Sequence, residues 1–223
     1  MSKIAFVGNS LQTMCNFRMG VISSLSQLGH EIVVIAPEDC NHRLLQISNV
    51  RFIPIEIDCK GMNPFIDLRL VQSLKKVYLK EHFDLIFHYT IKPVIYGGWA
   101  AARTRTQHIA VITGLGYTFL RKGWINRISK FLYSCSLRNA KEVWFLNQDD
   151  KTLFVEQNIV SLFKTRVPNG AGVDTTFYQS YQAPTSPFTS LFIGRVLWDK
   201  GIGEFVDAAR VLKQENPNLQ FHI

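Results

Sequence analysis

The chain has 223 residues, 47% of them hydrophobic and 19% charged, and a formal net charge of +8 at pH 7. This composition excludes an intrinsically disordered or fibrous chain, and no stretch reaches the ~18 consecutive apolar residues that a membrane-spanning helix needs. The four cysteines are scattered without a metal-binding spacing, which predicts reduced thiols in a cytoplasmic protein.

Short apolar runs alternate with helical patterns through the first two thirds of the chain. Strands are predicted where a run is continuous and rich in β-branched residues, at 3–8, 31–36, 51–57, 84–88, 108–112 and 142–146. Helices are predicted between them at 17–28, 64–80, 92–104 and 124–139. Continuous apolar strands separated by helices are typical of a parallel sheet covered on both faces. The sequence therefore predicts a doubly wound, Rossmann-like α/β domain.

The composition changes after Val167. Residues 168–188 are polar and rich in turn formers, which predicts a linker. A strand, a helix and a last strand follow at 190–194, 201–214 and 219–223. One β-α-β unit of about 35 residues cannot bury a core of its own. We therefore expect an N-terminal domain at 1–167, the linker, and an incomplete start of a second domain at 189–223, as in a fragment or a truncated product.

Basic residues are concentrated in the middle of the chain. No acidic residue lies between Asp84 and Glu142, whereas nine of the 25 basic residues do, which leaves 16 for the rest of the chain against all 17 acidic ones. Such a segment suits phosphates, nucleic acid or an anionic membrane surface, although a solvated basic face without a partner has the same pattern. No nucleic-acid-binding signature accompanies the charge, so we do not expect nucleic acid as a partner.

The helix predicted at 124–139 has an apolar stripe and a basic flank. The stripe carries Trp124, Ile128, Phe131 and Cys135, and the flank carries Arg127, Lys130, Arg138 and Lys141. Helices of this kind can lie in a membrane interface, but each helix of a doubly wound fold also needs an apolar stripe against its sheet. We expect this stripe to face the core. The candidate membrane or acceptor contacts are the residues that precede and open the helix: Phe119, Leu120, Arg121, Lys122 and Trp124.

Ligands of open parallel sheets bind at the carboxyl ends of the strands. After the first strand stands Gly8-Asn9-Ser10 rather than a G-x-G-x-x-G fingerprint, so NAD or FAD is not expected. The turn Gly114-Leu-Gly116 indicates either a close approach to a ligand or a plain turn. Arg195 and Lys200 flank a short loop between a strand and a helix, which indicates a diphosphate site or two ordinary surface cations.

Several motifs resemble glycosyltransferase family 4. In chain order they are Asn16-Phe-Arg18, Gly29-His30-Glu31, Gly114-Leu-Gly116, Pro168-Asn-Gly170, Val173-Asp174, Ile193-Gly-Arg195 and Lys200-Gly201. The stretch from Arg195 to Phe205 is similar in particular to bacterial transferases that extend undecaprenyl-diphosphate-linked sugars for O-antigen, capsule or glycoprotein glycans. The resemblance runs over nearly the whole chain.

The resemblance implies a retaining, metal-independent enzyme of the GT-B fold, in which two Rossmann-like domains face a cleft and of which this chain holds the first domain and the first β-α-β unit of the second. A nucleotide-sugar, expected to be a UDP-sugar, would be a co-substrate, and no cofactor is implied. Arg195 and Lys200 would stabilise the diphosphate as it leaves. The N-terminal domain would bind a polyprenyl-diphosphate-linked saccharide on the inner face of the cell membrane. Its cleft would be lined by Gly8, Asn9, Ser10, Arg18, Thr113, Gly114 and Gly116.

Two family features are absent from this sequence. The family's Glu-x7-Glu element would lie beyond residue 223, and Thr113-Gly114 stands where many members have a histidine. His88 is interpreted as a strand-end histidine, and no catalytic base is assigned. We expect the 223-residue chain alone to transfer little or no sugar. The alternatives are a non-catalytic remnant that only binds, and a GT-B sugar-nucleotide epimerase, against which Pro168–Asp174 with Arg195 and Lys200 favours the transferase.

Overall fold

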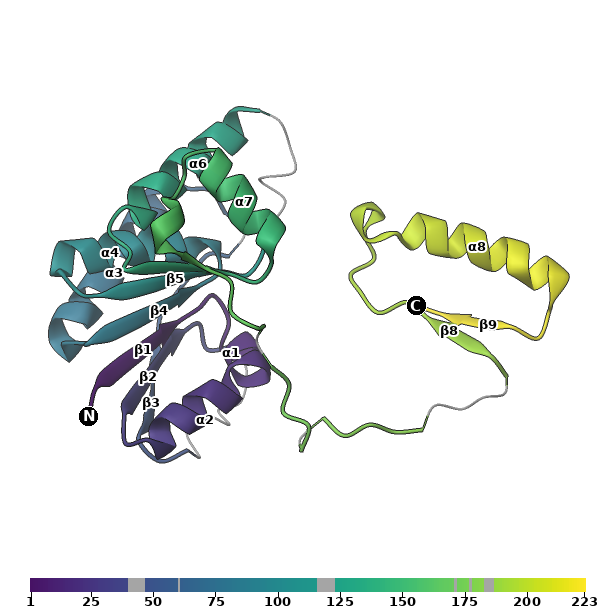
Figure 1. The fold of residues 1–223 in the computed structure, drawn as a ribbon, viewed down its shortest axis with the longest axis horizontal. Coiled ribbons are helices and arrows are strands. Elements are labelled where there is room, and N and C mark those ends of the chain that lie inside the picture. The colour runs from purple at the N-terminus through teal and green to yellow at the C-terminus, as the bar shows by residue number, and fades with distance from the viewer. Residues whose placement is uncertain (40–46, 60, 116–122, 171, 177, 183–186) are drawn as a thin grey trace. The chain divides into compact units, whose positions relative to one another are not determined.

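The computed structural model describes the chain from Met1 to Ile223 except for residues 40–46, 60, 116–122, 171, 177 and 183–186. The chain divides into two compact units, Met1–Asp174 and Thr175–Ile223 (Figure 1). The division falls within the stretch 168–188 that the sequence predicts as a linker.

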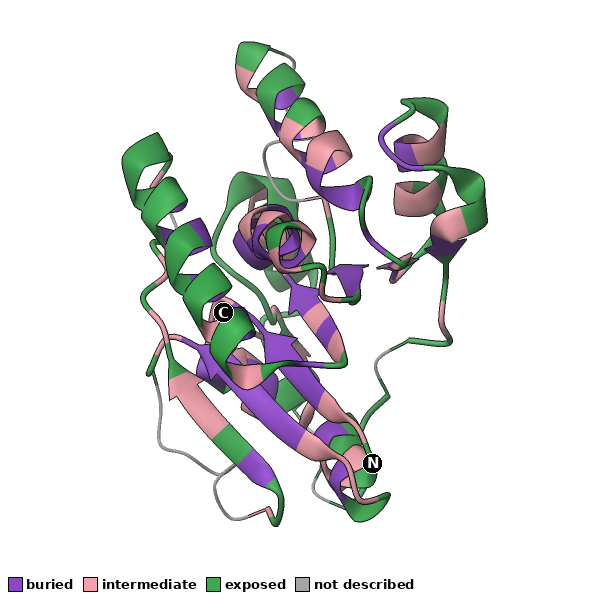
Figure 2. Ribbon diagram, turned by 90° about the vertical axis from the view of Figure 1, so that its left-hand side faces the viewer, coloured by how far each residue is buried: buried purple, intermediate pink, exposed green. Residues whose placement is uncertain are grey.

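Unit 1 is built on a parallel seven-stranded sheet with the order β3-β2-β1-β4-β5-β6-β7. The strands are β1 (Lys3–Val7), β2 (Glu31–Ala36), β3 (Val50–Pro54), β4 (Leu85–Tyr89), β5 (His108–Ile112), β6 (Glu142–Phe145) and β7 (Thr165–Arg166). The chain runs outward from β1 to β3 and then returns to β4 on the other side of β1, so the order reverses between β1 and β4. The central strands are buried on both faces (Figure 2). The predicted doubly wound α/β fold is confirmed.

Helices cover both faces of this sheet (Figure 1). One face is covered by α1 (Leu11–Phe17) and α2 (Met19–Gln27). The other face is covered by α3 (Pro64–Glu81), the π-helix η2 (Pro93–Gly97), α4 (Gly98–Thr104), α6 (Trp124–Leu137) and α7 (Gln148–Glu156). A short 3-10 turn, η3 (Leu162–Lys164), precedes β7. Because successive side chains of a strand point to opposite faces, Tyr89 packs on the side of α1, whereas Ile86 packs under α3.

The helix predicted at 17–28 corresponds to α2, and the sequence did not predict α1 before it. The Ser10 side chain accepts a hydrogen bond from the Thr13 backbone N–H at 3.1 Å and caps α1. Arg18 then interrupts the helical path with φ −125° and ψ −4°, and α2 follows. The loop after β1 is therefore short and leads directly into a capped helix.

The prediction that the α6 stripe faces the core is wrong. Trp124, Ile128 and Phe131 are 69%, 47% and 67% exposed. The buried side of α6 carries Asn126, Ser129, Tyr133, Ser136 and Leu137. The reason is a close helix contact: the Ser136 hydroxyl donates to the Val94 carbonyl at 2.6 Å, and a Cβ added to Gly98 would lie 2.1 Å from the Ser136 oxygen. Small side chains on the inner face let α6 approach η2 and α4.

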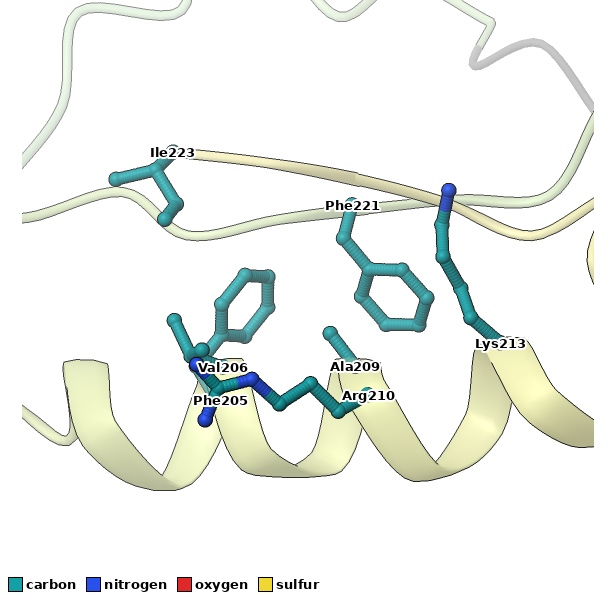
Figure 3. A pocket seen from close by; sticks show the side chains of 7 residues that line it. All are labelled: Phe205, Val206, Ala209, Arg210, Lys213, Phe221 and Ile223. Atoms are coloured by element: carbon teal, nitrogen blue, oxygen red, sulfur yellow. The ribbon is translucent and has the colours of Figure 1, made fainter.

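Unit 2 is one β-α-β element. Its strands β8 (Thr189–Leu191) and β9 (Gln220–His222) pair in parallel, and η4 (Trp198–Lys200) and α8 (Ile202–Glu215) connect them. The Phe205 ring of α8 packs 5.6 Å from the Phe192 ring and 5.9 Å from the Phe221 ring. Between helix and strand lies a largely apolar hollow (Figure 3). None of the residues that the structure describes in this unit is fully buried.

Candidate functional site

The carboxyl end of β1 lies where the strand order reverses, the position at which open parallel sheets bind ligands. Gly8 donates its N–H to the Ile35 carbonyl at 3.0 Å, and a Cβ on Gly8 would lie 2.1 Å from Met14 Cε. A side chain at this position would therefore displace the end of the Met14 side chain. Asn9 and Ser10 follow it, half-buried, and the Asn9 carbonyl accepts from the Cys59 thiol at 3.2 Å. This contact joins the loop after β1 to the segment after β3.

Arg18 lies at the same edge of the sheet, stacked on the end of β4. Its guanidinium carbon is 4.6 Å from the centroid of the Tyr89 ring. Tyr89 is 7% exposed, and burial raises the pKa of its hydroxyl to about 12, against an opposing contribution from Arg18. The next residue, Thr90, has φ +68°. Neither Tyr89 nor Thr90 was expected from the sequence, because nothing in the chain order links them to Arg18.

A buried ion pair lies directly behind this turn. Lys92 Nζ is 2.6 Å from an Asp67 carboxylate oxygen, and the Tyr96 hydroxyl donates to the other oxygen at 2.7 Å. Asp67 belongs to the first turn of α3, and Lys92 immediately precedes η2. Burial raises the pKa of Tyr96, and the Asp67 carboxylate raises it further. Lys92 is therefore not part of a basic surface, although the sequence placed it in the basic segment.

Thr113 and Gly114 follow β5 and are exposed. Gly114 has φ +142°, a conformation that favours glycine, and an added Cβ there would meet no atom within 4 Å. The glycine is therefore required by its backbone conformation. The remaining predicted residues of this region lie outside the described part of the chain: Gly116, Phe119, Leu120, Arg121 and Lys122.

Two histidines are buried beneath η2. His88 has no exposed surface, and one ring nitrogen is 2.9 Å from the Tyr78 hydroxyl. The His108 ring centroid lies 5.2 Å from that of His88. Burial lowers the pKa of His108 to about 4 and that of His88 well below its usual range, and the charge of His108 lowers the pKa of His88 further. Both are neutral core side chains, and neither reaches the surface.

In unit 2 the predicted cations stand on the connection between β8 and α8. Arg195 and Lys200 are exposed, and among the described residues no carboxylate lies within ion-pair distance of either. Gly201, with φ +80°, ends η4 and begins α8. A Cβ added to Gly203 would lie 2.3 Å from the Trp198 ring, so that ring covers the first turn of the helix. The loop is thus shaped by two glycines and leaves both cations available to an anion.

No three His, Cys, Asp or Glu side chains among the described residues lie close enough together to hold a metal ion. In the same part of the chain, no helix is both long and apolar enough to cross a membrane.

Residues 3–147 match a protein family described as glycosyl transferase 4-like. The chain is also 25% identical over 231 residues to the N,N'-diacetylbacillosaminyl-diphospho-undecaprenol alpha-1,3-N-acetylgalactosaminyltransferase of Campylobacter jejuni. That alignment covers 96% of this chain and 61% of the relative. The chain therefore spans about three fifths of the length of the curated relative it matches.

Solved structures with a similar fold include both transferases and epimerases. HepE from Anabaena, in complex with UDP and glucose, has a TM-score of 0.68 at 18% identity, covering 99% of this chain and 60% of that one. A glycosyltransferase from Rickettsia africae has a TM-score of 0.65 at 18% identity, covering 96% and 58%. The UDP-GlcNAc 2-epimerase from Methanocaldococcus jannaschii has a TM-score of 0.64 at 14% identity, covering 99% and 65%. These identities are low, so the likeness concerns the fold alone.

Proposed function

Because the chain belongs to the glycosyl transferase 4-like family, we propose that it works as a retaining, metal-independent glycosyltransferase. It would move a sugar from a UDP-sugar to a polyprenyl-diphosphate-linked saccharide in the synthesis of a surface polysaccharide or glycan. The observation that carries this proposal is the sequence match to the C. jejuni transferase over 96% of this chain, because that protein's name specifies a diphospho-undecaprenol acceptor. The likeness to epimerases, in contrast, is one of fold at 14% identity.

We propose that each unit binds one of the two substrates. In the transfer, the bond between the sugar and the donor diphosphate breaks, and its electron pair remains on the diphosphate oxygen. An acceptor hydroxyl oxygen forms the new bond to the anomeric carbon and releases its proton. Arg195 and Lys200 of unit 2 would stabilise the charge that grows on the leaving diphosphate. Unit 1 would bind the acceptor at the carboxyl edge of its sheet.

The test is to incubate the whole protein with a panel of UDP-sugars, with and without a synthetic polyprenyl-diphosphate sugar. We expect a longer lipid-linked saccharide that forms only with the acceptor, in the presence of EDTA as well as in its absence. An epimerised UDP-sugar formed without the acceptor would favour the epimerase, and acceptor binding without any turnover would favour a binding remnant. Either result would refute the transferase.

Replacing Arg195 by alanine is expected to weaken UDP binding by the whole protein more than tenfold, because hydrogen bonds between a guanidinium and a phosphate each contribute about 1.5–3 kcal/mol. Isothermal calorimetry measures this directly. Arg210→Ala is the matched control, since Arg210 is another exposed arginine of unit 2 and pairs with Asp207 at 3.0 Å. Unchanged UDP affinity in Arg195→Ala would remove Arg195 from the donor site.

Three residues of the α6 stripe, Trp124, Ile128 and Phe131, support a peripheral position on the inner face of the cell membrane. Three large apolar side chains stand exposed on one helix, and Arg127, Lys130 and Arg138 lie beside them. Aromatic residues next to basic ones are typical of helices that lie in a membrane interface. Each basic residue near an anionic surface contributes ~1 kcal/mol. We propose an anionic lipid surface as the partner of the stripe.

The double variant Trp124→Ser, Phe131→Ser is expected to lower partitioning onto vesicles of phosphatidylcholine with phosphatidylglycerol by more than tenfold, because each buried aromatic side chain contributes about 1.5–3 kcal/mol. Vesicle sedimentation at low and high salt measures the change. Leu28→Ser, Leu79→Ser is the matched control, since these side chains, at the C-cap of α2 and on α3, are 74% and 50% exposed. Equal binding of the parent to purely neutral vesicles, or an equal loss in the control, would contradict the proposal.

A further inference from the structure

Arg18 is a cation that the fold holds in place without neutralising it. Its guanidinium stacks on the Tyr89 ring at 4.6 Å, and the side chain is half-buried. Among the described residues, no carboxylate lies within ion-pair distance of it. A stacked guanidinium keeps its N–H donors in the plane of the group, where they can meet an anion. In Arg18, one of these donors makes a long contact of 3.4 Å with the Phe17 carbonyl.

Arg51, also in unit 1, shows what an arginine with a purely structural role looks like. Its guanidinium is 2.8 Å from Glu31 and 2.7 Å from Glu81, so its donors are taken by two carboxylates. Arg51 lies on β3 and ties that strand to its neighbours. Arg18, in contrast, is oriented by an aromatic face and keeps most of its donors available. Tyr89 therefore orients the Arg18 guanidinium, and no carboxylate of the described residues neutralises its charge.

The place of Arg18 also points to a ligand. Tyr89 is the last residue of β4, and β4 pairs with β1 where the strand order reverses. Thr90, which follows, is a β-branched residue at φ +68°, an unfavourable conformation that is often found at active sites and ligand-binding turns. The buried pair of Lys92 and Asp67 anchors the chain just after it. A strained turn, followed by a buried ion pair, thus supports the ring on which Arg18 lies.

We propose that Arg18, positioned by Tyr89, binds the diphosphate of the lipid-linked acceptor. This inference rests on the proposed function, in which two diphosphates take part. The donor diphosphate is assigned to Arg195 and Lys200 in unit 2, so the cation at the ligand edge of unit 1 is left for the acceptor. A planar guanidinium can bind two phosphate oxygens at once. Arg18 would then place the acceptor sugar by holding the group next to it.

The experiment compares two ligands on the whole protein by calorimetry: a water-soluble prenyl diphosphate linked to an N-acetylhexosamine, and UDP. Arg18→Gln is expected to weaken binding of the prenyl diphosphate sugar ten- to a hundredfold and to leave UDP binding unchanged. Arg18→Lys keeps the charge but loses the planar fork, so its affinity should fall between those of the parent and Arg18→Gln. Inorganic pyrophosphate should compete with the probe in the parent only.

Arg103→Gln is the matched control, because Arg103 is an exposed arginine of unit 1 whose guanidinium, among the described residues, makes one hydrogen bond, to the Trp99 carbonyl at 3.1 Å. The inference is overturned if the parent does not bind the probe, if Arg18→Gln binds it as the parent does, or if Arg18→Gln weakens UDP equally. The donor assignment is tested separately. If binding of the prenyl diphosphate sugar depends on Arg18 while UDP binding does not depend on Arg195, the acceptor site is retained and the donor site assigned to Arg195 is wrong.

Discussion

Replacing Asp67 by leucine is expected to lower the free energy of unfolding by about 3–5 kcal/mol. The substitution leaves the Lys92 ammonium buried without its counter-charge, which lies only 2.6 Å away in the parent. It also removes the acceptor of the Tyr96 hydroxyl. Urea unfolding followed by circular dichroism measures the loss. Because the pair anchors the turn after β4, we also expect the variant to hold Tyr89 and Arg18 less firmly.

The double variant Asp67→Leu, Lys92→Met separates the cost of an unpaired charge from the value of the pair. Lys92→Met alone should also destabilise, whereas the double variant should recover most of the loss, because a buried ion pair can often be replaced by apolar side chains at little cost. Asp207→Leu is the control: its pair with Arg210 is 74% exposed on both sides and contributes less than about 1 kcal/mol. Additive losses in the two single variants would contradict this account.

The sequence predicts the sheet well because central parallel strands are apolar on both faces. The strands expected at 31–36 and 108–112 have the bounds of β2 and β5 in the structure. Short helices were missed where the apolar pattern is brief. The α7 helix had a local signal nevertheless: the Asn147 side chain accepts from the Asp150 N–H at 2.7 Å, and Asp149 and Asp150 occupy the first turn.

Periodicity identified the stripe of α6 but assigned it to the wrong side. A helical repeat shows that apolar residues share a face, and it does not show whether that face meets the sheet or the solvent. Here the contact of Ser136 with Val94 and Gly98 determines the orientation, and the partners are far apart in the sequence. The consequence is functional, since it leaves Trp124 and Phe131 exposed beside basic residues.

The candidate site was only partly predictable for the same reason. Gly8, Asn9 and Ser10 could be placed because they directly follow a predicted strand. The stack of Arg18 on Tyr89 joins residues from different elements, and no spacing rule connects them. Lys92 was counted with the basic segment, because a sequence does not reveal that Asp67 meets it in the interior. Contacts between residues far apart in the sequence therefore form the part of the site that the motifs do not predict.

Acidification is expected to destabilise unit 1 through its buried histidines. Burial lowers the pKa of His108 from 6.5 to about 4; the Thr106 backbone opposes this, and the Lys164 charge adds a smaller lowering. The unfolded chain therefore binds this proton at a higher pH than the folded chain. Stability is highest above pH 6.5 and falls as the pH decreases toward 4, by about 3 kcal/mol for this side chain alone. His88 contributes in the same direction.

His108→Leu should flatten this acid profile. Neither ring nitrogen of His108 makes a hydrogen bond of normal geometry, and the Thr106 backbone is its one polar neighbour that affects its pKa favourably. An apolar side chain of similar size therefore loses little, and stability at pH 7 should be equal or higher. Urea midpoints between pH 7 and pH 4.5 measure the slope. The control is His82→Asn, at an exposed cap with φ 51° that asparagine tolerates. Parallel profiles for His108→Leu and the parent would show that the acid sensitivity arises elsewhere, whereas a selective loss of slope would assign it to the histidines under the π-helix.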